Sequence, residues 1–172
     1  MERWEKFRNF KQRGEWVELL FMAAAALHGY HVLKPWGDSF SYDIAIELLG
    51  GLLRVQVKST TKRTGSGYSC DLKPGPHRKR DYTLDQLDFF AAYVIPESVW
   101  YLIPAAAVLG TERRLSLMLC PVTGRRDGCK HEQYREAWGL LAKDRRDPVR
   151  RRKLLIPAAK RRKHTAPDIS PG

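Results

Sequence analysis

The sequence predicts an α/β domain in which a small mixed β-sheet is flanked by helices. One long amphipathic segment comes first, strand-like segments follow it, and a second helical segment precedes further strands. The chain has 172 residues, which suits one ordinary domain with its own core. We expect a folded domain over residues 1–142 and a basic, mostly disordered tail over residues 143–172.

The first expected element is a helix over residues 4–28. Apolar side chains recur there at helical spacings, and Gly29 marks the end. Gly14 is a candidate break within it. Its longest apolar run, residues 19–27, is far too short to cross a bilayer and predicts a core helix. No membrane association is therefore expected.

Three strand segments are expected next. Residues 30–35 predict a short strand, and a loop follows it. Residues 42–49 alternate with period two, so Asp43 faces away from the apolar side of the strand. Gly50 and Gly51 predict a tight turn into a strand over residues 52–59. The last two strands should therefore form a hairpin.

Polar residues share one face of the last of these strands. Gln56 and Lys58 lie on that face, while Val55 and Val57 lie on the other. Because the pleat has period two, Gln56 and Lys58 project together, and a slip of one residue would bury both. Asp43 on the neighbouring strand is expected to face the same pocket.

The rest of the chain is less regular. Residues 60–80 are polar, basic and rich in Gly and Pro, with a possible short strand over residues 68–72. A loop of this length is either functional or disordered. A helix capped by Thr83 is expected over residues 83–93. Two strands joined by a turn are expected over residues 93–95 and 99–103, and a last helix over residues 132–142.

The position of the charge matters more than its total. The formal net charge is +12, which alone is compatible with a nucleic acid, a membrane surface or a basic tail. Residues 1–142 carry only +4, whereas residues 143–163 carry eleven Lys and Arg against two Asp, or +9, and Asp168 accounts for the rest. The body is mildly basic and the tail strongly so.

Cysteine usage indicates a reducing, cytoplasmic setting. Cys70, Cys120 and Cys129 are an odd set without CxxC pairing, and the N-terminus lacks the apolar region of a signal peptide. Zinc binding by Cys120, Cys129 and His131 is a weaker hypothesis, because the spacing matches no usual structural site and a fourth ligand is not evident.

Four residues carry the chemistry that the sequence suggests. Glu18 lies on the helix, Asp43, Gln56 and Lys58 lie on the hairpin, and together they offer two carboxylates, an amide oxygen and an ammonium. Hydrolysis of a phosphodiester needs an activated water, neutralisation of charge at phosphorus and stabilisation of the leaving alkoxide. These side chains can meet those needs.

Several segments resemble the PD-(D/E)XK nuclease superfamily: Gly14-Glu15-Trp16-Val17-Glu18, Gly37-Asp38, Tyr42-Asp43-Ile44 and Gln56-Val57-Lys58. They are most similar to its branch of group I intron-encoded homing endonucleases, in which glutamine replaces the usual acid before X-Lys. Archaeal Holliday-junction resolvases share the Gly-x-x-x-Glu opening. The resemblance covers roughly residues 11–104, although Tyr42 stands at the nominal proline.

The resemblance implies a restriction-endonuclease-like core and a Mg²⁺-dependent DNA endonuclease. Glu18, Asp43 and Gln56 would hold the metal, and Glu18 is preferred to Glu15 because it follows Gly14 by four residues, as in the related enzymes. Lys58 would orient or deprotonate the attacking water, or stabilise the charged transition state. Because Gln56 is neutral, it should attract the ion less strongly than a carboxylate.

Each residue also has an ordinary structural explanation. Asp43 can be a solvated residue of a half-exposed strand. Gln56 and Lys58 can belong to an edge strand, where lysine protects against aggregation. Glu18 and Glu15 can be favoured by the helix dipole.

Double-stranded DNA is the expected partner, and no small-molecule cofactor is expected. The candidate phosphate contacts are basic residues of the loop: Lys62, Arg63, Arg78, Lys79 and Arg80. Cutting both strands needs two sites, which predicts a homo-oligomer, either a dimer or a tetramer. The alternatives are a structure-selective junction resolvase and an inactive DNA-binding protein of the same fold.

Overall fold

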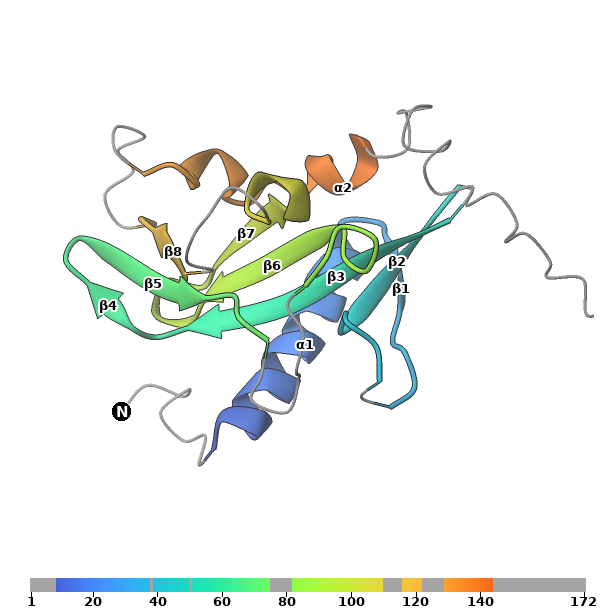
Figure 1. Ribbon diagram of the computed structural model, residues 1–172, viewed down its shortest axis with the longest axis horizontal. Helices are drawn as coiled ribbons and strands as arrows, with labels where there is room; N and C mark the ends of the chain where they lie inside the picture. The colour runs from blue at the N-terminus through green and yellow to red at the C-terminus, as the bar shows by residue number, and fades with distance from the viewer. Residues whose placement is uncertain are drawn as a thin grey trace, which may run out of the picture.

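The computed structural model describes residues 9–37, 39–49, 51–74, 82–109, 116–121 and 129–143. Within these residues the chain forms a five-stranded sheet, a three-stranded sheet and two α-helices (Figure 1). The larger sheet contains, in spatial order, β1 (His31–Leu33), β2 (Ile44–Leu48), β3 (Gly51–Thr60), β6 (Phe89–Val94) and β7 (Val99–Pro104). The smaller sheet contains β4 (Arg63–Thr64), β5 (Gly67–Asp71) and β8 (Ser116–Leu119). The helices are α1 (Phe10–Leu27) and α2 (Gly139–Lys143), and the 3-10 turns are η2 (Ile95–Glu97), η3 (Ala105–Ala107) and η4 (Glu132–Tyr134).

The helix α1 is continuous, so the expected break at Gly14 is wrong. Asn9 caps its start, where the side-chain oxygen accepts a hydrogen bond of 2.7 Å from the backbone N–H of Gln12. Gly29 follows its end with φ of 78°, a left-handed conformation that glycine adopts without strain. The predicted part before Asn9 lies outside the described residues.

The larger sheet is mixed, which confirms the predicted fold class. Strands β2 and β3 form the expected antiparallel hairpin, in which Ile44 pairs with Val55. Strand β3 then pairs with β6 in parallel, and β6 with β7 antiparallel. Because β3 is the third of five strands, the edge-strand explanation of Gln56 and Lys58 is wrong.

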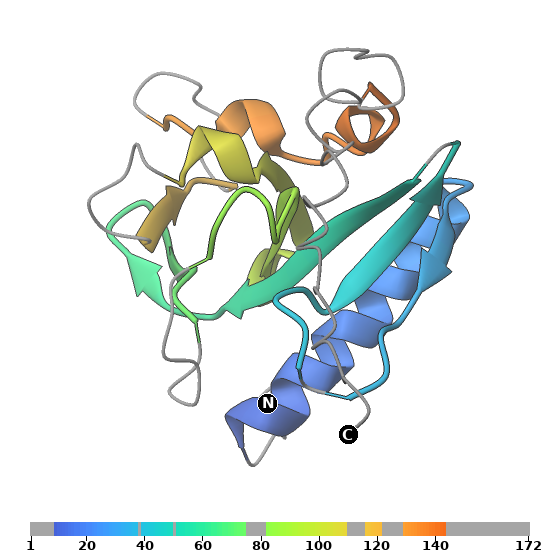
Figure 2. The same ribbon diagram turned by 45° about the vertical axis from the view of Figure 1, so that its right-hand side comes forward.

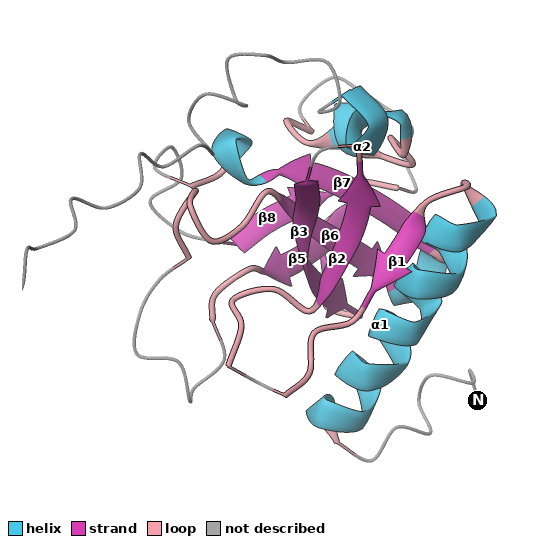
Figure 3. Ribbon diagram, turned by 90° about the vertical axis from the view of Figure 1, so that its right-hand side faces the viewer, coloured by secondary structure: helices cyan, strands magenta, loops and turns pink. Residues whose placement is uncertain are grey.

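Both faces of the larger sheet are covered. Val17, Phe21 and Ala25 of α1 are buried and belong to one core cluster with the apolar faces of β2 and β3. The opposite face belongs to a second cluster shared with β5 and β8. Figures 1 and 2 show α1 along one side of the sheet and the β4–β5 hairpin beyond the end of β3. Figure 3 shows α2 near the end of α1, where the Tyr30 hydroxyl donates to the carbonyl of Trp138 at 2.7 Å.

The helix predicted over residues 83–93 is wrong. A single turn forms instead, in which the carbonyl of Thr83 accepts from the N–H groups of Gln86 and Leu87. Strand β6 begins two residues later, and all six of its residues are buried. A strand buried on both faces has a continuous apolar run without alternation, which periodicity does not distinguish from a helix.

The last predicted helix is also divided. Turn η4 and helix α2 occupy its two ends, and Glu136 between them has a positive φ of 45°. Its carboxylate accepts from the N–H of Trp100 at 2.6 Å and from the indole N–H of Trp138 at 2.8 Å. These two hydrogen bonds, one local and one to a distant strand, hold Glu136 in a conformation that a continuous helix excludes.

The remaining expectations have mixed outcomes. Strand β5 confirms the short strand expected near residues 68–72. Cys120 and Cys129 form a disulfide, a pairing that the odd cysteine count did not indicate, and Cys70 is a buried free thiol.

No helix in the described segments is long and apolar enough to cross a membrane. Residues 144–172 lie outside the description, so the domain boundary stays a prediction.

Candidate active site

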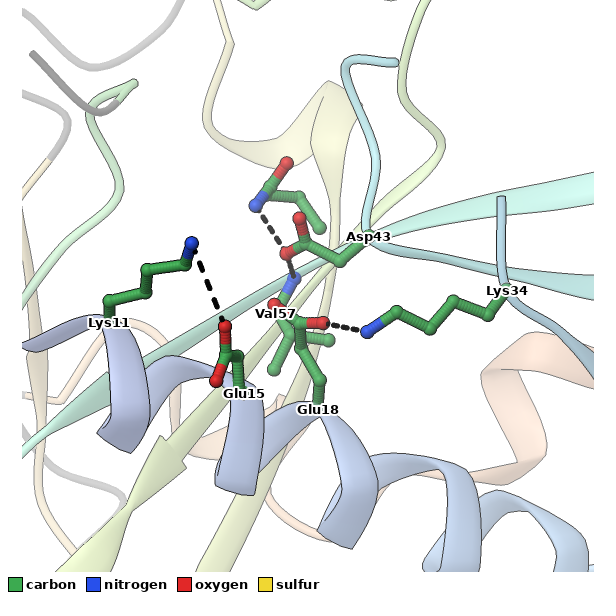
Figure 4. A network of polar contacts seen from close by, with 7 residues as sticks. Lys11, Glu15, Glu18, Lys34, Asp43 and Val57 are labelled. Carbon is green, nitrogen blue, oxygen red and sulfur yellow. Dashed lines mark hydrogen bonds and ion pairs between the residues drawn. The ribbon is translucent and has the colours of Figure 1, made fainter. Parts of the chain in front are cut away.

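Asp43 lies at the centre of a polar cluster, immediately before β2. Its backbone N–H donates to the carbonyl of Val55 at 3.0 Å, which ties Asp43 to β3 just before β2 begins. Its Oδ2 atom accepts hydrogen bonds from the N–H of Val57, at 2.9 Å, and from Nε2 of Gln56 (Figure 4). The pairing of β2 with β3 therefore fixes where the Asp43 carboxylate lies.

Two glutamates of α1 have different surroundings. Glu18 has a side chain that is only 20% exposed, and its Oε2 accepts from Nζ of Lys34 at 2.5 Å. Glu15 is 59% exposed and its carboxylate lies 4.0 Å from the ammonium of Lys11, one turn earlier on the helix. Figure 4 shows Glu15 paired with Lys11 and Glu18 paired with Lys34. Of the two, Glu18 acts electrostatically on Asp43.

The electrostatics of the cluster disfavour a charged Asp43. Burial raises the pKa of Asp43 to about 6, from an ordinary value of 3.8, and the negative charge of Glu18 contributes in the same direction. The hydrogen bond from Val57, the positive charge of Lys58 and the hydrogen bond from Gln56 act in the opposite direction without cancelling the rise. An added cation would relieve this repulsion between carboxylates.

Gln56 has a buried acceptor that no protein group satisfies. Its side chain is 6% exposed, and Oε1 has no hydrogen-bond partner among the described residues, while Nε2 donates to Asp43. A buried amide oxygen without a donor costs about 1–3 kcal/mol. A cation held by this oxygen and the neighbouring carboxylates would remove that cost, so the residues present fit a hard divalent ion.

Lys58 completes the group from the same strand. Its ammonium donates to the carbonyl of Lys73 at 2.8 Å and lies 5.5 Å from the ring centroid of Tyr82. Its positive charge lowers the pKa of Asp43, so the two groups interact across the site. The structure thus brings together the four residues that the sequence singled out, around Asp43.

Comparison with known proteins assigns the family. A family model described as PD-(D/E)XK endonuclease matches residues 8–141. The chain belongs to the PD-(D/E)XK endonuclease family. The fold of this endonuclease is similar to that of a bacterial homing endonuclease, I-Ssp6803I, with a TM-score of 0.67 and 28% sequence identity over 79% of this chain and 95% of that chain. No curated protein matches in a sequence comparison.

Membership of the family establishes an endonuclease with DNA as its substrate. Nucleases of this family generally depend on divalent metal ions. Among the described residues no three His, Cys, Asp or Glu side chains are grouped to hold a metal. In this endonuclease the candidate ligand set therefore depends on the amide of Gln56 as well as on the two carboxylates. The zinc hypothesis fails, since Cys120 and Cys129 are joined in a disulfide.

The candidate DNA contacts of the endonuclease are only partly described. Lys62 lines a cleft beside the cluster, and Arg63 is exposed on β4. Arg78, Lys79 and Arg80 lie outside the described residues. Their role in binding DNA stays a prediction.

Sequence reasoning missed two cations of the endonuclease. Lys34 pairs with Glu18, and this pair raises the pKa of Lys34. Arg54 on β3 donates from Nε to Oδ2 of Asp88 at 2.9 Å and from Nη2 to Oδ1 at 3.1 Å. Both pairs join segments that are distant in sequence. Of the two cations, only Arg54 could have been noticed from the local sequence, because it is a charged residue within an otherwise apolar part of its strand.

Proposed function

We propose that this endonuclease hydrolyses phosphodiester bonds of double-stranded DNA with Mg²⁺, as a homing or related site-specific enzyme. The observation that carries the proposal is the unsatisfied Oε1 of buried Gln56 beside the Asp43 carboxylate. The similarity to I-Ssp6803I, described as a bacterial homing endonuclease, supports the narrower assignment.

The proposed Mg²⁺ ligands are Glu18, Asp43 and Gln56. When bound there, the ion would polarise the phosphate and lower the pKa of a bound water. Glu18 and Asp43 supply two negative charges, which match a divalent ion, and Gln56 supplies a neutral oxygen. Because Lys34 already pairs with Glu18 at 2.5 Å, the metal has to compete with that ammonium.

Several residues would hold the site ready for the reaction. The N–H of Val57 and the amide of Gln56 fix the Asp43 carboxylate. The carbonyl of Lys73 anchors the ammonium of Lys58. We assign to Lys58 the stabilisation of negative charge on the phosphate in the transition state and the orientation of the attacking water, since its charge already reaches Asp43.

The proposed enzyme is a homo-oligomer, either a dimer or a tetramer. One chain offers one cluster of this kind within the described residues, and cutting both strands of a duplex needs two. Sedimentation of the purified protein tests this part, and a monomer that nevertheless makes double-strand breaks would contradict it.

The catalytic test is cleavage of supercoiled plasmid with and without Mg²⁺. Glu18→Gln, Asp43→Asn and Lys58→Ala should each lower the rate by about 10²-fold or more. Glu15→Gln is the matched control, because it removes an exposed carboxylate of the same helix and should cleave at the wild-type rate. A wild-type rate for Asp43→Asn or Lys58→Ala would show that the site is wrong.

The substrate is tested with the same protein on linear duplex and on a four-way junction. Preferential cleavage of a pool of duplex targets supports the proposal. Preference for the junction would identify a resolvase. Salt-sensitive binding without products, in Mg²⁺, would identify an inactive DNA-binding protein.

A further inference from the structure

A cleft of about 580 Å³ opens beside the catalytic cluster. Its walls are the first turns of α1, the end of β3 with the two residues that follow it, and β5. Val57 and Lys58 line one end of it, so the cleft is continuous with the proposed catalytic site. Its volume lies within the range of about 300–1,000 Å³ that is usual for ligand sites.

The cleft is predominantly basic. Its charged lining residues are Lys11, Arg13, Lys58 and Lys62 against a single carboxylate, Asp71. Asp71 accepts a hydrogen bond from the N–H of Lys73 at 2.9 Å. An excess of positive charge in a concave surface attracts anions, and DNA backbone phosphates are the anions that a nuclease meets.

Arg13 has a hydrogen-bond donor that the protein does not satisfy. Its guanidinium lies 5.0 Å from the ring centroid of Phe10, and Nε is buried without a partner in the described structure. Burial lowers the pKa of Arg13, which reflects the cost of holding this cation away from water. A phosphate oxygen would satisfy the donor and offset that cost.

Gly14 leaves space at the same place. It lies inside α1, where glycine is less favourable than alanine, and a Cβ atom added there would meet nothing within 4 Å. The fold therefore does not require a glycine at this position. Because Gly14 also lines the cleft, the missing side chain allows a ligand to approach the helix backbone closely.

We propose that this cleft binds a phosphate of the DNA backbone next to the scissile phosphate, with Arg13 as its ligand and Gly14 as the point of close approach. This inference rests on the proposed nuclease site, since it extends the path of the DNA strand away from Lys58. Arg13 is thus a positioning residue that holds the strand in register with the catalytic cluster.

The test measures binding of a duplex oligonucleotide by fluorescence anisotropy in EDTA, at a series of salt concentrations. Arg13→Gln should weaken binding about tenfold. It should also reduce the slope of log K against log salt by about 1, because one phosphate contact is lost. Lys130→Gln is the matched control, since it removes one exposed positive charge that does not line the cleft.

Gly14→Ala separates binding from folding. Alanine favours the helix, so this variant should melt at or above the wild-type temperature and still bind DNA more weakly. Wild-type affinity in both Arg13→Gln and Gly14→Ala would overturn the proposal. An equal loss of salt slope in Lys130→Gln would also overturn it. The weaker binding of Arg13→Gln would then reflect the lower net charge of the protein and not a phosphate contact in the cleft.

These outcomes are distinct from those of the catalytic test, because binding in EDTA requires no metal. If Asp43→Asn abolishes cleavage while both Arg13→Gln and Gly14→Ala bind DNA normally, the cleft assignment alone fails. If Arg13→Gln loses affinity and one unit of salt slope while Asp43→Asn still cleaves, the catalytic assignment alone fails.

Discussion

Replacing Asp43 with asparagine should make the protein more stable while removing its activity. The carboxylate is held beside Glu18 in a poorly solvated position, which raises its pKa to about 6. Asparagine resembles the protonated form, because it is neutral and keeps a carbonyl oxygen to accept from the N–H of Val57. The substitution therefore removes an unfavourable charge without removing that hydrogen bond.

The magnitude follows from the pKa values. A pKa of about 6 in the folded protein against 3.8 for an ordinary aspartate corresponds to about 3 kcal/mol. Because the folded pKa is raised, the favourable contribution of protonated Asp43 is fully present below pH 3.8 and is lost as the pH rises through 6. The advantage of Asp43→Asn should therefore be small near pH 4 and reach its full value above pH 7.

The assay is urea denaturation of both proteins without added metal, from pH 4 to pH 8. The difference in the free energy of unfolding should rise through this range to about 3 kcal/mol in favour of Asp43→Asn. Glu15→Gln should stay within about 0.5 kcal/mol of wild type, as is usual for an exposed substitution. An Asp43→Asn variant that is less stable at pH 7.5, or a difference independent of pH, would refute the reasoning.

Three further predictions concern the metal, the sheet and the disulfide. Mg²⁺ should raise the melting temperature of the wild type, by an amount equivalent to about 2.7 kcal/mol at one hundred times its Kd, and should leave Asp43→Asn nearly unchanged; equal shifts in both would place the metal elsewhere. Arg54→Met should cost about 1.5–3 kcal/mol in urea denaturation, because Asp88 then loses its charged partner, and a neutral result would mean that solvent replaces it. Reduction of the Cys120–Cys129 bond, which spans 9 residues, should cost about 2.5 kcal/mol by loop entropy, and an unchanged melting temperature in reductant would contradict this.

The hairpin that carries most of the candidate site could be predicted from local signals. Alternation of apolar and polar residues marked both strands, and Gly50 and Gly51 marked the turn between them. Pairing then follows from the turn, and it places Asp43 beside Gln56. Local sequence was sufficient because these residues are only 13 positions apart.

Strand β6 could not be predicted in the same way. Leu84, Leu87, Phe90 and Ala91 also fit one face of a helix, so the pattern is ambiguous. The choice is made by tertiary structure, because β3 and β7 pair with the two edges of this segment and the two core clusters bury its two faces. Of these, β3 is distant in sequence from β6, and periodicity carries no information about it.

The electrostatic environment of the cluster was also beyond local reasoning. The pairing of Lys34 with Glu18 depends on how α1 packs against the sheet. Gln56 is buried beside Phe90 of the second core cluster, with which it pairs across β3 and β6, so its burial also depends on tertiary structure. The sequence suggested which residues carry the chemistry, whereas the balance of their charges required the tertiary structure.

The amide of Gln56 has a consequence for how well the proposed metal site is preorganised. Through Nε2 it donates a hydrogen bond that restrains the carboxylate of Asp43, while its Oε1 accepts none from the described residues. A glutamate of the same shape has no N–H to donate, so it would repel Asp43 and let both side chains reorient. Glutamine thus restrains these side chains when the protein folds, and a divalent ion binding at the proposed site would have less side-chain entropy to remove from its ligands.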